Sequence, residues 1–373
     1  MGDQTKSTRG AGGRRGKGAT GRRRKARGTR RRALMITGWS LLGTLVLAGA
    51  GLGYLYFKLN GNLTSVDINS ALRGDRPENV DNGSMDLLVL GSDSRAGKNG
   101  RYGKDEGTSR SDTAMVVHVY KGHKKATVVS IPRDTLVKRP ACTKDGEKTP
   151  AARRAMFNTA YEVGGPACAV KTVEAMTGIR MDHYLEVDFS GFKDLVDELG
   201  GVDLTTTEPI RDKQSHLNLP KGKHNLDGEQ ALGLVRTRHG VGDGSDLGRI
   251  KLQQAFIKAL IDQIKDIGLF SSPKKLYGLA DTSTKALTTD SELGSVDKLL
   301  GFADGLKGID SDDMRMITLP VMYDPQDPDR VSPMDSKAKR VWQALRDDKD
   351  VPKSATKGSA GDETDAGKVV AAG

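Results

Sequence analysis

The residues best suited to chemistry in this chain are aspartates and arginines that flank short apolar segments. They are Asp93, Arg110, Asp112 and Arg133, with Asp134 directly after the last of these. Mg²⁺ binds one or two protein carboxylates and completes its shell with phosphate oxygens and water. Arginine offers a planar fork of donors that matches phosphate oxygens. These residue types predict a site for Mg²⁺ and a phosphate-bearing substrate, where cations neutralise charge on a leaving phosphate.

Three predicted β-strands bring these residues together. The strands cover 86–91, 113–119 and 126–131, and the connection 121–125 fits a hairpin loop. If the first two strands pair in antiparallel fashion, the aspartates and arginines at their ends and after the third strand lie at one rim of the sheet. Ligand sites in α/β proteins often lie at strand ends. The alternative is that these residues have no role in chemistry, because aspartates commonly cap turns and Asp–Arg pairs commonly lie in solvated loops.

A second polar cluster lies farther along the chain and consists of Arg236, Arg238, Asp246, Arg249 and Gln253. In an extended chain the first two arginines point to the same face. Arg249 and Gln253 are four residues apart, and this spacing places them one turn apart on a predicted helix. The cluster could clamp a polyanion, or it could form a solvated face beside its own aspartates. The sequence alone does not connect it to the first cluster.

Strands and helices alternate through the rest of the region from 85 to 350. Further strands are predicted over 183–187, 202–206 and 314–319, and helical patterns over 151–178, 189–199, 227–233, 250–264, 291–306 and 336–346. This order predicts an α/β domain with a mixed central β-sheet and helices on both faces.

The positive charge of the chain belongs to its N-terminal tail. The net charge is +11, but residues 1–33 hold 13 Lys and Arg against one acid, which leaves the remainder at −1. A tail over 1–32 without aromatic residues cannot bury a core, so we expect it to be disordered. Nucleic-acid binding by this tail is the alternative, and no aromatic residues or folded reader accompany it.

Residues 33–57 carry no formal charge and predict a transmembrane helix. As a helix they would span about 37 Å, enough to cross a bilayer core of about 30 Å. A signal peptide is the competing interpretation, but the apolar run is long and no convincing cleavage site follows. The basic tail would stay in the cytoplasm, and the rest would lie outside the cell membrane as a single-pass protein. We expect a polar stalk over 58–84 and a disordered tail over 351–373.

The chain contains two cysteines, Cys142 and Cys168, both in the predicted external part. An even count in an oxidising compartment favours a disulfide over two free buried thiols.

The order of motifs resembles the LytR-CpsA-Psr family across most of 85–265. The motifs are GSDSR (91–95), RSDT (110–113), SIPRD (130–134), FNTAY (157–161), DHYLEVDFSGF (182–192), VDELGGVDL (196–204), LDGEQAL (226–232), VRTRH (235–239) and DxxRxxxQQ (246–254). Each motif is weak alone, but their joint order is specific. The sequence departs from the family at Leu252, where an arginine is common, and in a long loop over 96–109.

The resemblance implies a Mg²⁺-dependent phosphotransferase that moves a glycopolymer from a polyprenyl-pyrophosphate carrier onto peptidoglycan through a phosphodiester. By motif match, Asp93 and Asp112 would hold Mg²⁺, and Asp246 would activate the acceptor hydroxyl. The residues that would bind pyrophosphate are Arg110, Arg133, Arg236, Arg238, Arg249 and Gln253. Asp134 would orient Arg133, and the polyprenyl chain would lie in an apolar slot between helices.

Two other functions are compatible with the same sequence. A polyprenyl-pyrophosphate hydrolase would use the same site with water as the acceptor. A membrane-bound transcriptional regulator would act through its basic tail instead, so loss of the tail, and not of Asp93, would abolish its function.

Overall fold

The computed structural model describes most of the chain and divides it into two units. The described residues are 27–72, 74, 76–92, 111–144, 146–238, 241, 246–266, 272–362 and 369–372. The first unit is Met1–Leu55, and the second is Tyr56–Gly373.

Helix α1 (Arg27–Asn62) begins in the first unit, where the described apolar side chains are exposed, among them Trp39, Leu45 and Leu47. Within the described residues, no helix has a segment both long enough and apolar enough to cross a membrane. Several side chains of the predicted span 33–57 lie outside the described part of the chain. Residues 1–26 of the basic tail also lie outside it. The transmembrane segment and the disordered tail therefore stay predictions.

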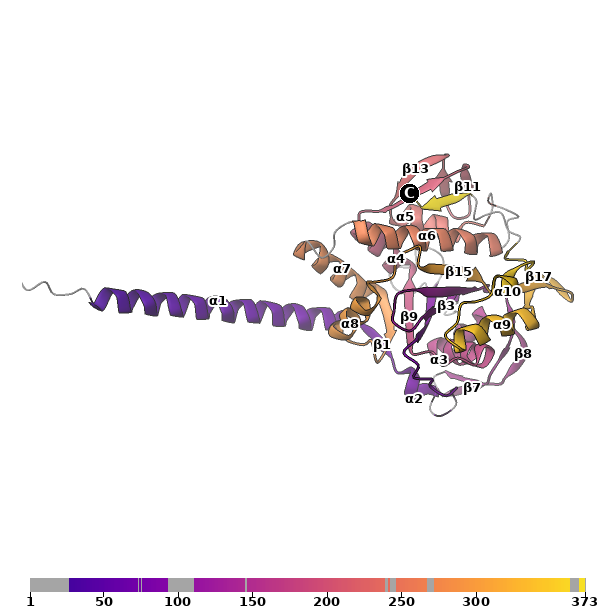
Figure 1. The fold of residues 1–373 in the computed structure, drawn as a ribbon, viewed down its shortest axis with the longest axis horizontal. Coiled ribbons are helices and arrows are strands. Elements are labelled where there is room, and N and C mark those ends of the chain that lie inside the picture. Colours follow the sequence, from indigo (N-terminus) through magenta and orange to yellow (C-terminus); the bar gives the residue numbers. More distant parts are fainter. Residues whose placement is uncertain are drawn as a thin grey trace, which may run out of the picture. The chain divides into compact units, whose positions relative to one another are not determined.

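The second unit is built on a mixed seven-stranded sheet, as the sequence predicts (Figure 1). In spatial order its strands are β1 (Thr64–Val66), β14 (Leu287–Asp290), β9 (His183–Asp188), β2 (Met85–Ser92), β3 (Ser111–Val119), β4 (Ala126–Ile131) and β15 (Met314–Thr318). Strands β2, β3 and β4 pair in antiparallel fashion, whereas β9 and β15 join them in parallel.

The register of the central strands creates one polar rim. Gly91 of β2 lies opposite Thr113 of β3, and Ala114 lies opposite Ile131 of β4. The end of β2, the start of β3 and the end of β4 therefore meet at the same edge, which confirms the predicted arrangement. Every residue of β4 is buried, as expected for a strand covered on both faces.

Helices cover both faces of the sheet (Figure 1). Helices α3 (Asn158–Thr177) and α9 (Asp335–Arg346) pack over a core that includes Leu88, Val116 and Tyr184. Helices α4 (Phe189–Glu198), α5 (Gly228–Arg236) and α6 (Asp246–Asp266) lie on the other side. A crevice lies between these three helices and the sheet.

Smaller elements surround this frame. They are α2 (Ile68–Leu72), β5 (Leu136–Arg139), β6 (Cys142–Lys144), β7 (Glu147–Thr149), β8 (Ala152–Met156), β10 (Val202–Thr206), β11 (Ile210–Asp212), β12 (Leu217–Leu219), β13 (Gly222–Leu226), α7 (Pro273–Ala286), α8 (Val296–Leu306), β16 (Val321–Asp324), β17 (Asp327–Pro333), α10 (Lys353–Thr356) and β18 (Val370–Ala372). The sequence did not predict α7, which begins with Ser272 as its N-cap and a proline in its first turn.

The predicted disulfide is present between Cys142 of β6 and Cys168 of α3, whose Cα atoms are 5.6 Å apart. Helix α3 is interrupted in its middle, because Gly165 has φ 60° and ψ −155° just before Pro166. Gly164 lies against the disulfide, and a Cβ atom there would come within 2.4 Å of the Cys168 Cβ atom. The glycine therefore allows helix and bridge to lie in contact.

The predicted stalk over 58–84 is wrong, because its described residues belong to the folded unit. Strand β1 extends the main sheet by pairing with β14, and Ile68 and Leu72 of α2 are buried in the core. The segment looked like a stalk because its partners lie far away in the sequence. The polar composition of residues 58–84 does not indicate these distant partners.

The C-terminal segment 351–373 is also more ordered than predicted, in the parts that are described. Val351 and Ala355 are buried in the core beneath α9, and Val370 is buried in the cluster beside α6. Strand β18 pairs with β10 in antiparallel fashion. Single apolar residues widely spaced among small and charged ones are enough to hold this segment to the domain.

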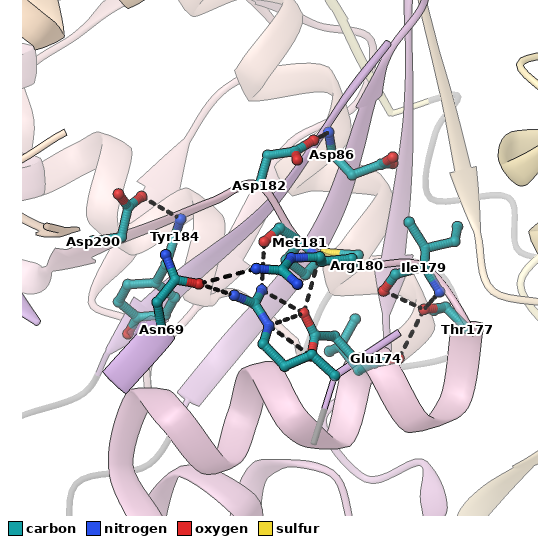
Figure 2. A network of polar contacts seen from close by, with 12 residues as sticks. Asn69, Asp86, Glu174, Thr177, Ile179, Arg180, Met181, Asp182, Tyr184 and Asp290 are labelled. Atoms are coloured by element: carbon teal, nitrogen blue, oxygen red, sulfur yellow. Dashed lines mark hydrogen bonds and ion pairs between the residues drawn. The ribbon is translucent and has the colours of Figure 1, made fainter. Parts of the chain in front are cut away.

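A buried ion pair fixes the segment that follows α2. The Nη2 atom of Arg76 lies 2.6 Å from Oε1 of Glu174 on α3, and both side chains are nearly inaccessible to solvent. Arg76 also donates to the carbonyl of Met181, and Glu174 accepts from the Met181 amide. Figure 2 shows this network around Glu174, with Asn69 and Arg180 at its edge. Because the charges satisfy one another, the polar segment can enter the interior.

We predict that Arg76→Met lowers the free energy of unfolding by about 3–5 kcal/mol, because it leaves the Glu174 carboxylate buried without its partner. Denaturant unfolding measures this change. Lys307→Met is the matched control, because Lys307 pairs with Asp304 on the surface and should change stability by no more than about 0.5 kcal/mol. Equal effects of the two substitutions would contradict the prediction.

A buried histidine makes stability depend on pH. His118 on β3 lies 2.8 Å from Oδ1 of Asp86 and 3.2 Å from Oδ1 of Asp348, which follows α9. Burial lowers the pKa of His118, but the two carboxylates raise it more, so that its pKa lies above the ordinary 6.5. Because the pKa of His118 is raised in the folded state, the stabilisation by protonated His118 is complete at pH values below the pKa of the unfolded state. It is lost as pH rises through the folded pKa.

We therefore expect the free energy of unfolding to decrease as pH rises above about 6.5, and His118→Asn to flatten this dependence. Chemical unfolding at a series of pH values measures the slope. His216→Asn, at an exposed position, should keep the slope of the unaltered protein. An unchanged slope in His118→Asn would assign the pH dependence to other groups.

Candidate active site

A crevice of about 410 Å³ lies between the sheet and helices α4, α5 and α6. One part of its lining is charged and the other part is apolar. The charged part consists of Asp112, Arg133, Arg236, Arg238 and Arg249, with Asp188, Asp212 and Gln253 nearby. The apolar part includes Met115, Val187, Phe189, Phe192, Leu232, Val235, Phe256, Ile257 and Leu260. Residues of both clusters predicted from the sequence thus line one cavity.

Arg133 is the central cation at the rim of the sheet. Its Nη1 donates to Oδ1 of Asp112 at 2.6 Å, and its Nε lies 3.5 Å from Asp134 and 3.7 Å from Asp246. Burial lowers the pKa of Arg133, but the charges of Asp112 and Asp134 outweigh it and raise the pKa overall. Asp134 thus lies beside the guanidinium that it is predicted to orient.

The segment that carries Arg236 and Arg238 is not extended as predicted. Helix α5 continues through Arg236, and Thr237 leaves the helix with φ −61° and ψ 131°. The predicted alternation of side chains therefore does not apply, yet both arginines line the crevice. The guanidinium carbon of Arg236 lies 4.8 Å from the centre of the Phe189 ring, at the junction of the charged and apolar parts.

Helix α6 begins at the site and supplies Asp246 and Arg249 in its first turn. These two side chains form an ion pair, and Nη2 of Arg249 also donates to the backbone carbonyl of Asp112 at 3.1 Å. Arg249 is only 5% exposed. Burial is the largest cause that lowers its pKa, and the charges of Arg238 and Arg133 act in the same direction.

Asp246 joins the two predicted clusters. Its Oδ1 lies 3.7 Å from Arg133 and 3.7 Å from Arg238, and it pairs with Arg249. Oδ2 of Asp246 has no hydrogen-bond partner among the described residues, and the same holds for the Nε atoms of Arg133 and Arg249. Buried polar atoms without partners are uncommon. This arrangement is suited to a ligand that completes the hydrogen bonding.

Gln253 occupies a supporting position. Its Nε2 donates to Oγ1 of Thr113 at 3.0 Å and to the carbonyl of Val235 at 2.9 Å. Both hydrogens of the amide therefore bond to protein groups, although Gln253 lines the crevice. The neighbouring Gln254 donates to Oγ of Ser130 on β4 at 3.1 Å. The pair holds α6 against β3, β4 and α5.

The predicted residues Asp93 and Arg110 lie outside the described residues. Asp112 is therefore the one predicted magnesium ligand that can be tested, and its carboxylate faces the arginine cluster. Within the described part of the chain, no three His, Cys, Asp or Glu side chains converge on a metal position. The donors present fit Mg²⁺ held by a carboxylate together with the substrate's own phosphate oxygens.

Sequence reasoning missed several residues of the crevice. Asp212 and Ser215 reach it from the hairpin formed by β11 and β12, and Phe189, Phe192 and Phe256 form its apolar walls. The phenylalanines lie at helical positions that usually belong to a core, so their spacing gave no separate signal. Asp212 follows an isoleucine and an arginine in a short strand, a pattern that any surface hairpin could have.

The comparison with known proteins decides the family. The model of the LytR_cpsA_psr family matches residues 55–349. The chain belongs to this family. The predicted family resemblance is therefore confirmed, and the match covers the whole crevice.

Several proteins of the LytR-CpsA-Psr family resemble the chain in sequence. It is 31% identical to the cell wall biosynthesis protein LcpA of Corynebacterium glutamicum over 76% of its own length, and 33% identical to TagT of Bacillus subtilis over 73%. TagT is named a polyisoprenyl-teichoic acid–peptidoglycan teichoic acid transferase, and the match covers 82% of it. The matches span 59% of LcpA and 47% of the related LcpB.

The fold of this LytR-CpsA-Psr protein also agrees with solved structures. TagT bound to LI-WTA superposes with a TM-score of 0.54 at 27% identity, over 74% of this chain and 97% of TagT. A LytR-Csp2A-Psr enzyme from Actinomyces oris has a TM-score of 0.55 at 24% identity, over 76% of this chain and 95% of that one. These likenesses confirm the mixed α/β fold.

We predict that inorganic pyrophosphate stabilises the LytR-CpsA-Psr unit against unfolding through the arginine cluster. At a concentration about 100 times the Kd, the stabilisation should reach about 2.7 kcal/mol. Arg238→Gln should reduce it strongly, whereas Arg330→Gln, on β17 away from the crevice, should not. Thermal unfolding with and without pyrophosphate measures the effect. Equal stabilisation of all three proteins would place the anion elsewhere.

Proposed function

We propose that this protein is a phosphotransferase that attaches a glycopolymer, carried on polyprenyl pyrophosphate, to peptidoglycan through a phosphodiester. The observation that carries this proposal is the crevice itself, in which a charged part continues directly into an apolar part. The names of LcpA and TagT support a role in the cell wall.

The two parts of the crevice match the two parts of such a donor. Four described arginines, Arg133, Arg236, Arg238 and Arg249, line the charged part. Guanidinium groups bind phosphate oxygens in a bidentate manner, so several of them suit a pyrophosphate. The phenylalanines and aliphatic side chains beyond them suit a prenyl chain, because apolar surface is stabilised when it leaves water.

The arginines would act mainly on the charge of the leaving group. When an acceptor hydroxyl attacks the phosphorus atom, negative charge increases on the departing polyprenyl phosphate, and fixed guanidiniums stabilise it without rearrangement. Arg133 is held by Asp112 and Asp134, and Arg249 by Asp246. Positioning and charge neutralisation would supply most of the rate, as in other phosphoryl transfers.

Asp246 would accept the proton of the acceptor hydroxyl, a sugar hydroxyl of peptidoglycan. Its two oxygens are buried within the arginine cluster, and Oδ2 has no hydrogen-bond partner among the described residues. A hydroxyl that enters the crevice could therefore donate to it. The nearby guanidiniums would keep this carboxylate in place during the transfer.

Asp112, together with Asp93, would hold Mg²⁺ beside the pyrophosphate. When bound, the ion would add positive charge to the phosphate oxygens. Asp112 already orients Arg133 through a hydrogen bond of 2.6 Å. The same carboxylate would thus bring the metal and the arginine to the same phosphate.

We also propose that the protein acts outside the cytoplasm, attached to the membrane by residues 33–57 with its N-terminus inside. A donor with a prenyl chain is confined to the membrane, so an enzyme for it gains from being anchored there. The disulfide between Cys142 and Cys168 supports an oxidising compartment.

The test is a transfer assay with the full chain in detergent, a polyprenyl-pyrophosphate-linked glycan, peptidoglycan and Mg²⁺. We expect polyprenyl phosphate to be released and label to enter the peptidoglycan. Arg133→Ala should lower the rate about 10²–10³-fold, the usual loss for one preorganised donor, and Asp93→Ala should do so as well. Arg330→Ala is the matched control and should retain the full rate.

Three outcomes separate the candidate functions. Labelled peptidoglycan that depends on Arg133 and Asp93 supports the transferase. Release of polyprenyl phosphate with water as the acceptor, without label in the peptidoglycan, would support the hydrolase instead. No turnover of several donors would refute both and favour a regulator that acts through residues 1–32.

A further inference from the structure

The short segment Arg236–Arg238 places two arginines in the crevice from the end of a helix. Thr237 lies between them and is completely buried, and its φ and ψ angles are already those of an extended chain. The Thr237 amide still donates to the carbonyl of Leu234 in α5, whereas the Arg238 amide donates to a group outside the helix. What holds this segment therefore decides where its arginines point.

The hairpin formed by β11 and β12 holds the segment at a first point through Asp212. Oδ1 of Asp212 accepts hydrogen bonds from the amides of Gln214 at 2.8 Å and Ser215 at 3.4 Å, within the turn of the hairpin. Oδ2 accepts a hydrogen bond from the amide of Arg238 at 3.0 Å. One buried carboxylate thus connects the turn to the backbone of an arginine in the crevice.

A second contact joins Ser215 to Thr237. Their hydroxyl oxygens are 2.8 Å apart, and Oγ1 of Thr237 also donates to the carbonyl of Gly233 at 2.8 Å. A hydroxyl has one proton to donate, so Ser215 must be the donor to Thr237. Helix α5 comes close to the hairpin here because Gly233 has no side chain. A Cβ atom at that position would lie 3.1 Å from the Ser215 carbonyl oxygen.

We propose that Asp212, Ser215 and Thr237 are positioning residues that aim Arg236 and Arg238, and that the hairpin thereby gives the site its preference for pyrophosphate over monophosphate. This inference rests on the proposed function. Arg133 and Arg249 approach the crevice from the end of β4 and from α6, whereas Arg236 and Arg238 approach from the end of α5, which the hairpin contacts at Arg238. A single phosphate can be bound by one pair, but a pyrophosphate can engage both.

The two pairs differ in how they are held, although Arg133, Arg238 and Arg249 all lie beside Asp246. Arg133 and Arg249 are fixed by Asp112 and Asp246 through direct contacts. Arg238 lies 3.7 Å from Asp246 and is 30% exposed, so its own ion pair holds it less closely. Its backbone contact with Asp212 is therefore the stronger restraint on its direction.

The experiment measures binding of geranylgeranyl pyrophosphate and of geranylgeranyl monophosphate to the full chain in detergent, by calorimetry. We expect Asp212→Asn and Thr237→Val to weaken binding of the pyrophosphate about tenfold, as for the loss of one hydrogen bond near a charged group. Binding of the monophosphate should change less than threefold. Thr237→Ser keeps the hydroxyl and should restore the pyrophosphate affinity.

The controls separate positioning from general destabilisation. Asn218→Ala changes an exposed residue of the same hairpin and should leave both affinities unchanged. Ser215→Ala combined with Thr237→Val should weaken pyrophosphate binding no more than Thr237→Val alone, because the two residues form one contact. Thermal unfolding of every variant accompanies the binding measurements.

Each outcome bears on the inference. Equal weakening of both ligands by Asp212→Asn and Thr237→Val would assign these residues a merely structural role and overturn it. Unchanged binding in these variants, with loss in Arg238→Gln, would also overturn it while leaving the proposed function intact. If the unaltered protein binds neither lipid phosphate, the proposed function fails, and the inference fails with it.

Discussion

The structure of the site depends on the compensation of buried positive charge. Arg249 is almost completely buried, and Arg133 and Arg238 are only partly exposed. A buried charge without a partner is strongly destabilising, so the fold must place carboxylates among them. Asp112 from the sheet and Asp246 from α6 fulfil this requirement. The site is therefore stable before any ligand arrives, and its arginines are already arranged to receive an anion.

This compensation also explains why elements distant in sequence converge at the rim. Asp246 must lie at the first turn of α6 to reach three arginines, and a carboxylate is favourable there because of the helix dipole. Gln253 and Gln254, two turns later, fix the helix to the strands that carry Asp112 and Arg133. Phe256, Ile257 and Leu260 of α6 then form part of the apolar wall. One helix thus contributes to both the charged and the apolar part of the crevice.

The sequence predicted what is encoded locally and missed what depends on distant partners. Strands β2 to β4 are short apolar runs separated by turn residues, so their pairing and common rim could be predicted. Strand β1 could not be predicted, because its only signal is a partner more than two hundred residues away. The extended interpretation of Arg236 was wrong because the capping box of α5, with Asp227 and Gln230, sustains the helix for two turns. Residue types are visible in a sequence, but the distances between residues far apart in the chain are not.

The junction between the two parts of the crevice limits the ligands that it can select. Arg236 stacks on Phe189 where the charged lining ends, so a guanidinium and an aromatic ring share one wall. A free sugar phosphate would leave the apolar part in contact with water, and a simple lipid would leave the arginines without a partner. Each of these ligands therefore lacks the favourable contacts of one part of the crevice. A lipid with a pyrophosphate head group contacts both the charged and the apolar part. Selection by such a crevice therefore follows from the combination of charge and apolar surface in a single ligand, and neither property alone is sufficient.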